Sequence, residues 1–242
     1  TTAMAVGMSA CSNSSTQAKY DKTLSWMTTS EIQTLDQNKM VDTTSGEQAD
    51  NVFEGLNRID NHGNVKPAVA TKSVPSKDGK TWTFTLRKNA RWSNGDPVTA
   101  DDFVYSLQRT LDPKTHSQQQ NIYQAVKNAD EVVAGKVSST KLGVEAKDKH
   151  TLVVHLKHPV PYFKTMTAST WDPVNKKVVE KYGKKYGTTS KYMVYNGPYV
   201  HKGWTGSNLT SKLKKNPYYW DHQNVKLDTV NYTVQKTPST DY

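Results

Sequence analysis

An alternating segment near the middle of the first half places the strongest constraint on the fold of this chain. Between Lys80 and Arg87, the large apolar side chains Trp82, Phe84 and Leu86 alternate with threonines. Alternation with a period of two residues predicts a strand that has one buried and one exposed face. The chain therefore contains a sheet that is half-buried along this strand.

A turn and a capped helix follow directly. The turn has the sequence Ser-Asn-Gly-Asp-Pro at 93–97, and Thr99 and Asp102 have the spacing of a capping box. Asp101 and Asp102 both favour a helix amino terminus, and Pro113 predicts the helix end. The cap accounts for both carboxylates, and adjacent helical residues point about 100° apart. We therefore do not interpret the two as a catalytic acid and base.

Helices and strands are mixed along the rest of the chain, without a regular βαβ order and without an internal repeat. Helices are predicted at 48–56, 119–134 and 176–182, and strands at 23–27, 150–156, 193–195, 199–202, 208–214 and 229–235. An α+β or mixed α/β fold follows. Trp82, Trp92 and Tyr199 are expected in its core.

The charge of the chain limits its partners. The formal net charge is +10, but only four of the 32 basic residues are arginine, whose planar fork is favoured by nucleic-acid readers. Residues 171–242 hold 12 lysines against 5 acidic residues, net +7, and residues 1–170 are net +3. Two interpretations stay open: a solvated lysine-rich surface, or attraction to an anionic envelope, mucus polymer or membrane surface. Nucleic acid is not an expected partner.

Cys11 is the only cysteine, so an internal disulfide and a multi-cysteine metal site are excluded. Residues 8–11 (MSAC) resemble a lipobox, with Met8 in the place where leucine is usual. Residues 1–11 are interpreted as the tail of a signal peptide in an unprocessed, truncated precursor, with lipid attachment at Cys11. The alternative is an ordinary small residue in a frayed terminus. Residues 12–22 are a polar, flexible spacer, and no stretch reaches the roughly 18 apolar residues of a membrane span.

Catalytic and cofactor motifs are absent from the sequence. There is no HExxH, no Gly-x-Ser-x-Gly nucleophile elbow and no glycine-rich phosphate loop. His155 and His158 lie three residues apart, but on a strand they do not share a face and no carboxylate or cysteine accompanies them. We therefore predict no enzyme, no metal and no cofactor.

Several spans resemble one family, the extracellular solute-binding proteins of family 5, which contains the oligopeptide-binding proteins of ABC importers. The resemblance lies in 51–56 (NVFEGL), in 63–70 and, most strongly, in 78–106, which includes the alternating strand and the capped helix. It continues in 196–199 (NGPY) and 216–221 (NPYYWD). Order and spacing agree over nearly all of residues 23–242.

The resemblance implies a periplasmic-binding-protein fold of type II, in which two lobes close on a ligand. Residues 23–53 and 171–242 would form an incomplete first lobe, and 54–170 the small additional domain of the peptide-binding branch. The second lobe would be missing. In the family that lobe carries the aspartate that pairs with the amino terminus of the peptide, so no residue here inherits that role.

The family binds the peptide main chain through strand-like hydrogen bonds and keeps roomy side-chain pockets. By position, Val41, Asp42 and Thr43 resemble a ligand-facing segment of the first lobe. Gln119 stands where the small domain reaches the ligand and a tyrosine is common. Instead of contacting a ligand, Asp42 could simply lie in a surface loop and Gln119 could simply be the polar start of a helix.

The expected function is that of an extracytoplasmic lipoprotein, anchored to the outer side of a bacterial cell membrane, which captures oligopeptides for an ABC importer without catalysis. The alternative is a cell-surface adhesin whose lysines bind acidic mucin or matrix polymers. A hydrolase has no nucleophile and base to support it.

Overall fold

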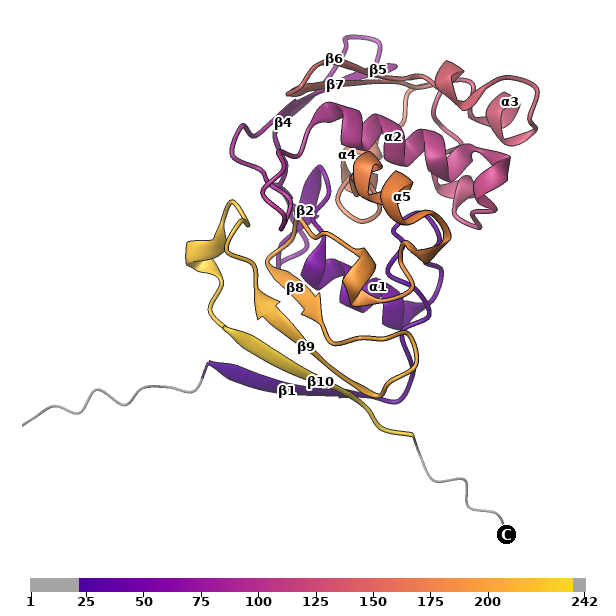
Figure 1. The fold of residues 1–242 in the computed structure, drawn as a ribbon. Helices are drawn as coiled ribbons and strands as arrows, with labels where there is room; N and C mark the ends of the chain where they lie inside the picture. Colours follow the sequence, from indigo (N-terminus) through magenta and orange to yellow (C-terminus); the bar gives the residue numbers. More distant parts are fainter. Residues whose placement is uncertain (1–21, 237–242) are drawn as a thin grey trace, which may run out of the picture.

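The computed structural model describes residues 22–236. Cys11 and the remainder of the expected lipobox lie outside these residues. Two four-stranded sheets lie at opposite ends of the molecule, and the helices α1, α2 and α5 lie between them (Figure 1). The described part of the chain has no helix that combines the length and the apolar character needed to cross a bilayer.

The first sheet, named here the terminal sheet, joins both ends of the described chain. Its strands are β1 (Thr23–Thr28), β10 (Thr229–Val234), β9 (Thr210–Lys215) and β8 (Tyr199–Lys202), in the order β1-β10-β9-β8. β1 pairs in parallel with β10, and the other neighbours are antiparallel. The four strands predicted in these regions are confirmed, and α1 (Thr43–Val52) lies over the inner face of the sheet (Figure 1).

The second sheet, named here the central sheet, contains the alternating segment of the sequence. It is antiparallel, in the order β4 (Ala70–Pro75), β5 (Thr81–Leu86), β7 (Thr151–His155) and β6 (Val144–Asp148). Trp82, Phe84 and Leu86 of β5 are buried, as predicted. Phe163 packs against this face with its ring 5.4 Å from that of Trp82.

α2 (Ala100–Leu111) covers the central sheet, and its amino terminus is capped as the sequence predicts. The carboxylate of Asp102 accepts the backbone N–H of Thr99 at 2.9 Å and the indole N–H of Trp92 at 3.1 Å. Burial raises the pKa of Asp102 to about 6, although both hydrogen bonds act to lower it. The helix ends before Pro113. Trp92 is fully buried, and Tyr199 is partly buried against the core.

Three predicted elements are corrected. The helix expected at 48–56 is α1, which begins at Thr43 because Asp42 caps it, and which ends at Val52 as the chain becomes extended at Phe53. In place of a helix over 119–134 there are a 3₁₀ turn at Gln120–Tyr123 and α3 (Ala129–Val133), because Asn128 adopts a left-handed φ of 65°.

The third correction concerns the strand expected at 193–195, which does not form. The backbone N–H and C=O of Tyr195 bond instead to the side chain and backbone of Ser93, in a turn far away in the sequence. α5 (Lys176–Tyr182) has the predicted bounds. The remaining elements are β2 (Asn57–Ile59), β3 (Val65–Pro67), α4 (Phe163–Met166) and short 3₁₀ turns at Pro113–Thr115, Ser139–Lys141, Gly183–Lys185, Ser190–Tyr192 and His222–Asn224.

Two chain segments connect the region of the terminal sheet with that of the central sheet, and they run side by side. The N–H of Asn57 donates to the carbonyl of Thr167 at 3.2 Å. Gly55 lies so close to the second segment that a Cβ atom there would be 2.8 Å from the carbonyl oxygen of Trp171. Only glycine permits this approach.

Candidate functional site

The loop between β1 and α1 contains the segment that the sequence singled out, and it buries polar side chains. Asp36, Gln37 and Asn38 are only 2%, 6% and 2% exposed. The backbone N–H groups of Lys39 and Met40 both donate to the carbonyl of Asp36, at 2.9 and 3.2 Å. Burying polar groups in a loop costs free energy unless they form hydrogen bonds. The hydrogen-bond partners of these residues therefore show what holds the loop in place.

Arg109, in the last turn of α2, binds this loop from the side of the central sheet. Its two terminal nitrogens each donate to one oxygen of Asp36 at 2.7 Å, and Nη1 also donates to Oδ1 of Asn38 at 2.7 Å. The amide of Asn38 in turn donates to Oγ of Ser106 at 2.9 Å. Burial acts to lower the pKa of Arg109, but the hydrogen bonds and charge of Asp36 outweigh it and raise the pKa. The pair therefore stays ionised and holds the loop on α2.

Gln37 fixes the same loop to the segment that follows the central sheet. Its Oε1 accepts the hydroxyl of Tyr186 at 2.7 Å, and its Nε2 donates to the carbonyl of Pro173 at 3.2 Å. Burial raises the pKa of Tyr186 well above its ordinary value, so the phenol keeps the proton that it donates. The loop is thus held from two directions.

Gln119 contacts the loop directly and therefore lies close in space to the residue that precedes Val41. Its side-chain amide donates to the carbonyls of Gln37, at 3.1 Å, and of Met40. Ser117 adds a hydrogen bond of 2.6 Å to the carbonyl of Asn38. The structure therefore brings Gln119 to the segment that precedes Val41, although 78 positions separate the two residues in the sequence.

Val41, Asp42 and Thr43 lie on the outer side of this anchored loop and differ in what they offer. Asp42 caps α1, and its carboxylate accepts the N–H of Ser45 at 2.8 Å. The side chain of Val41 is 62% exposed, and that of Thr43 is exposed as well. Within residues 22–236, neither the N–H nor the C=O of Val41 has a hydrogen-bond partner. Open backbone groups on a rigid base are what strand-like recognition of another chain requires.

No group of three His, Cys, Asp or Glu side chains in the described part of the chain is placed to hold a metal ion. The ring of His155 contacts Glu145 and Thr81 at 3.4 and 3.3 Å, and that of His158 lies 3.3 Å from the carbonyl of Pro159. The two histidines therefore do not converge on one site.

Sequence reasoning missed the residues that hold the loop, above all Asp36 and Arg109. One signal was present: arginine is rare in this chain, and an arginine at the end of an apolar helix face is a candidate for a fixed pair. The sequence does not show which acidic residue is its partner, because 73 positions separate the two. Peptide binding by Val41, Asp42, Thr43 and Gln119 stays a prediction.

The described residues thus form a mixed α/β fold with an anchored loop on which the backbone of Val41 is open. The model of the bacterial extracellular solute-binding proteins, family 5, matches residues 64–242. The chain belongs to this family. Its members are binding proteins rather than enzymes, which confirms the expectation that this is not an enzyme.

Named relatives agree with this assignment. A dipeptide-binding protein of Lactococcus lactis is 40% identical over 90% of this chain and 40% of its own length. The periplasmic oligopeptide-binding protein OppA of Salmonella typhimurium is 43% identical over 88% of this chain and 39% of its own length. The chain thus spans about two fifths of the length of these relatives.

Solved structures show the same fold. The substrate-binding domain of an oligopeptide ABC transporter from Bacillus anthracis superposes with a TM-score of 0.88 at 45% identity, over 91% of this chain and 43% of that one. Listeria monocytogenes OppA bound to peptide gives a TM-score of 0.87 at 37% identity, over 89% and 43% of the two chains. The mixed α/β fold expected from the sequence is confirmed.

Proposed function

We propose that this chain contributes part of an oligopeptide-binding site in an extracytoplasmic binding protein that delivers peptides to an ABC importer. Binding is reversible and involves no covalent step. Support comes from the family, from relatives named as dipeptide- and oligopeptide-binding proteins, and from the peptide-bound structure of Listeria OppA. The comparisons give no support to the adhesin alternative.

The observation that carries this proposal is the open main chain of Val41 on a loop that is fixed from below. A peptide in extended conformation pairs with free N–H and C=O groups whatever its side chains are, which gives affinity without narrow sequence preference. The contacts of Asp36, Gln37 and Gln119 fix the loop before a ligand arrives. Less conformational entropy is then lost on binding.

We further propose the domain division 23–53 and 171–242 for the first lobe and 54–170 for the small domain. The position of each four-stranded sheet supports it, because β1 and β8–β10 belong to the first pair of segments and β4–β7 to the second. In this proposal Gln119 brings the small domain to the ligand side of the first lobe, and a second lobe closes over the peptide.

Lipid attachment at Cys11 is proposed on the sequence Met8-Ser9-Ala10-Cys11 alone. Expression in a bacterial host with an alkyne-tagged fatty acid is expected to label the protein, and Cys11→Ser is expected to lose the label. Equal labelling of both proteins would contradict attachment at this residue.

The proposed function is tested with the chain extended to the length of its relatives, by calorimetric titration with a pool of short peptides. Val41→Pro removes one N–H donor and is expected to weaken binding about tenfold, the equivalent of one hydrogen bond. Val41→Ala keeps the N–H and is expected to bind as the parent does. Peptide is also expected to slow hydrogen exchange at the Val41 amide.

Two outcomes would contradict the proposal in different ways. If the extended parent binds no peptide, the function is wrong. If Val41→Pro and Val41→Ala bind equally and the Val41 amide gains no protection, peptides bind elsewhere. Denaturant unfolding of both variants serves as the control for folding.

A further inference from the structure

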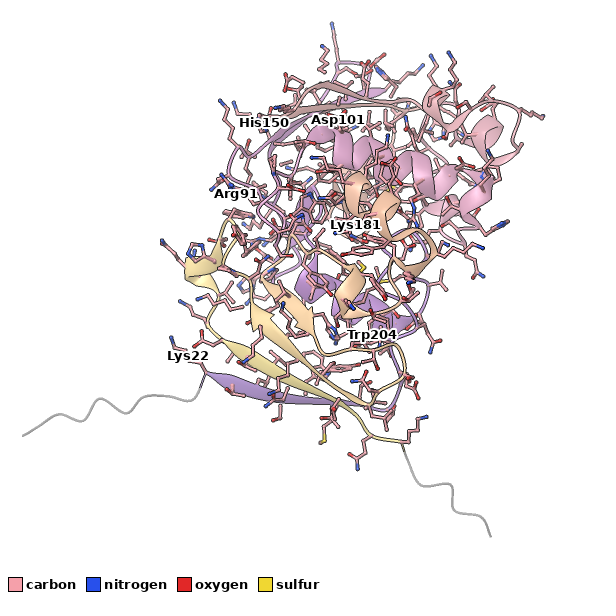
Figure 2. The ribbon with its side chains drawn as sticks, in the orientation of Figure 1. Lys22, Arg91, Asp101, His150, Lys181 and Trp204 are labelled. Atoms are coloured by element: carbon pink, nitrogen blue, oxygen red, sulfur yellow. The ribbon has the colours of Figure 1, made fainter. Side chains whose placement is uncertain are left out.

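A pocket of about 750 Å³ lies at the terminal sheet, and Val41 is not among the residues that line it. It is bounded by the segment 189–193, by the end of β8 with the loop that follows it, and by the end of β9. Figure 2 labels Trp204 in the loop after β8, at the edge of this region. The volume is within the range of pockets that hold small molecules.

The charge of this basic pocket is one-sided. Lys191, Lys202, Lys214 and Lys215 all line it, and none of its lining residues is Asp or Glu. Within the described residues, none of these four lysines forms an ion pair, and the one hydrogen bond among their ammonium groups joins Lys214 to the hydroxyl of Thr229 at 2.8 Å. Unneutralised like charges in a concavity raise the local concentration of anions.

Tyr192, in the wall of the pocket, lies next to two lysines. The ammonium groups of Lys185 and Lys191 lie 5.6 and 6.0 Å from the centre of its ring. Two cations therefore lie within reach of one aromatic ring. The positive charge continues from the pocket along the segment before it.

The histidine in the wall does not contribute charge. Both ring nitrogens of His201 are close to hydroxyl groups, Ser190 at 3.1 Å and Ser211 at 3.3 Å. Burial lowers the pKa of His201 to about 4, so the ring is neutral at physiological pH. The positive charge of the pocket thus comes from its lysines.

The remaining wall suits the organic body of a ligand. Trp204 is 5% exposed and packs edge-on against His201, with centroids 6.1 Å apart, and Val200 and Met193 add apolar surface. Oγ1 of Thr189 is buried at the pocket without a hydrogen-bond partner. A buried hydroxyl without a partner is rare in native proteins.

We propose that the basic pocket binds a phosphate group carried on a small polyol or sugar. Several ammonium groups without an acidic partner match the double charge of a phosphate dianion better than the single charge of a carboxylate. Each lysine acts on phosphate as a point charge. The aromatic and hydroxyl walls receive the polyol. Phosphate occurs as a dianionic monoester in free sugar phosphates and as a monoanionic diester in phosphodiester polymers. Val41, which carries the proposed peptide contact, does not line this pocket.

The test measures thermal unfolding of the chain with glucose 6-phosphate, with glucose, and with potassium chloride at matched ionic strength. At ten times its Kd, glucose 6-phosphate is expected to raise Tm by about 4 °C, and the other two solutes to leave Tm unchanged. Lys202→Gln together with Lys215→Gln is expected to weaken glucose 6-phosphate binding at least about tenfold. The matched control is Lys177→Gln with Lys184→Gln, which removes the same charge outside the pocket and is expected to bind as the parent does.

Three results of this test would contradict the proposal. Equal weakening in both double variants, no shift with glucose 6-phosphate, or an equal shift with glucuronate would overturn the phosphate site. A parallel titration with poly(glycerol phosphate) identifies the source: tighter binding per phosphate than glucose 6-phosphate assigns the pocket to a polymer, and equal or weaker binding to a free phosphate ester.

Discussion

Replacing Arg109 with methionine is expected to lower the free energy of unfolding by about 3 to 5 kcal/mol, the usual loss when one partner of a buried ion pair is removed. The side chains of Arg109 and Asp36 are only 13% and 3% exposed, so the substitution leaves a buried carboxylate without its charged partner. Asn38 loses the same donor. Urea unfolding of the parent and Arg109→Met at pH 7 measures the difference.

A second arginine offers the matched control. Arg91 is exposed, is labelled at the molecular surface in Figure 2, and makes one long hydrogen bond of 3.3 Å to the carbonyl of Gly95. Arg91→Met is expected to change stability by no more than about 0.5 kcal/mol. Asp36→Asn combined with Arg109→Met is expected to be less destabilised than Arg109→Met alone, because no buried charge is then left unpaired. A loss below about 1 kcal/mol in Arg109→Met would show that the pair does not hold the loop.

Gly187→Ala is expected to lower the free energy of unfolding by about 3 kcal/mol and to displace the loop of Asp36. Gly187 has a φ of +80°, which costs an L-residue about 1 kcal/mol. A Cβ atom at this position would also lie 2.5 Å from Cβ and 2.6 Å from N of Asp36, and overpacking of this kind costs about 2 kcal/mol more. The carbonyl of Gly187 also accepts the N–H of Leu35 at 2.9 Å, so the clash disturbs the loop at its base.

Gly63 separates the two causes, because its φ is +81° but nothing lies within 4 Å of a Cβ added there. Gly63→Ala is expected to lower the free energy of unfolding by only the cost of the positive φ, about 1 kcal/mol. Urea unfolding of both variants gives the comparison. If the two lose equal stability, the close approach of Gly187 to Asp36 contributes nothing, and its role in holding the candidate site is refuted.

Local signals allowed the strands and capped helices to be predicted well. The alternation of β5 and the capping of α2 by Asp102 depend on neighbours within a few residues, so the pattern alone determines them. The helix expected at 119–134 failed for a reason of the same kind, since one residue, Asn128, takes a left-handed conformation that its type tolerates but does not require. The sequence does not show which tolerated conformation is used.

The candidate site was predictable only in part. The resemblance singled out Val41–Thr43, whose contact with a ligand stays a prediction. The buried contacts beneath them join residues from separate elements, and periodicity carries no information on such pairings. Asp42 illustrates the difference: it was singled out for ligand contact, and its carboxylate caps α1. The carbonyl of Asp42 accepts the N–H of Gly46 at 3.1 Å, so the N–H and C=O of Val41 are the main-chain groups proposed to meet a ligand.

The parallel pairing of β1 with β10 has a consequence for the order of events during synthesis. Thr23 is opposite Thr229, so β1 is made more than 200 residues before its partner strand. Protein synthesis adds about 5 to 20 residues per second, so β10 is made roughly 10 to 40 s after β1. Through that interval β1 has no partner in its own sheet, and its exposed Trp26 and Met27 are open to other extended segments. A factor that holds new chains apart would therefore act on this strand during that interval.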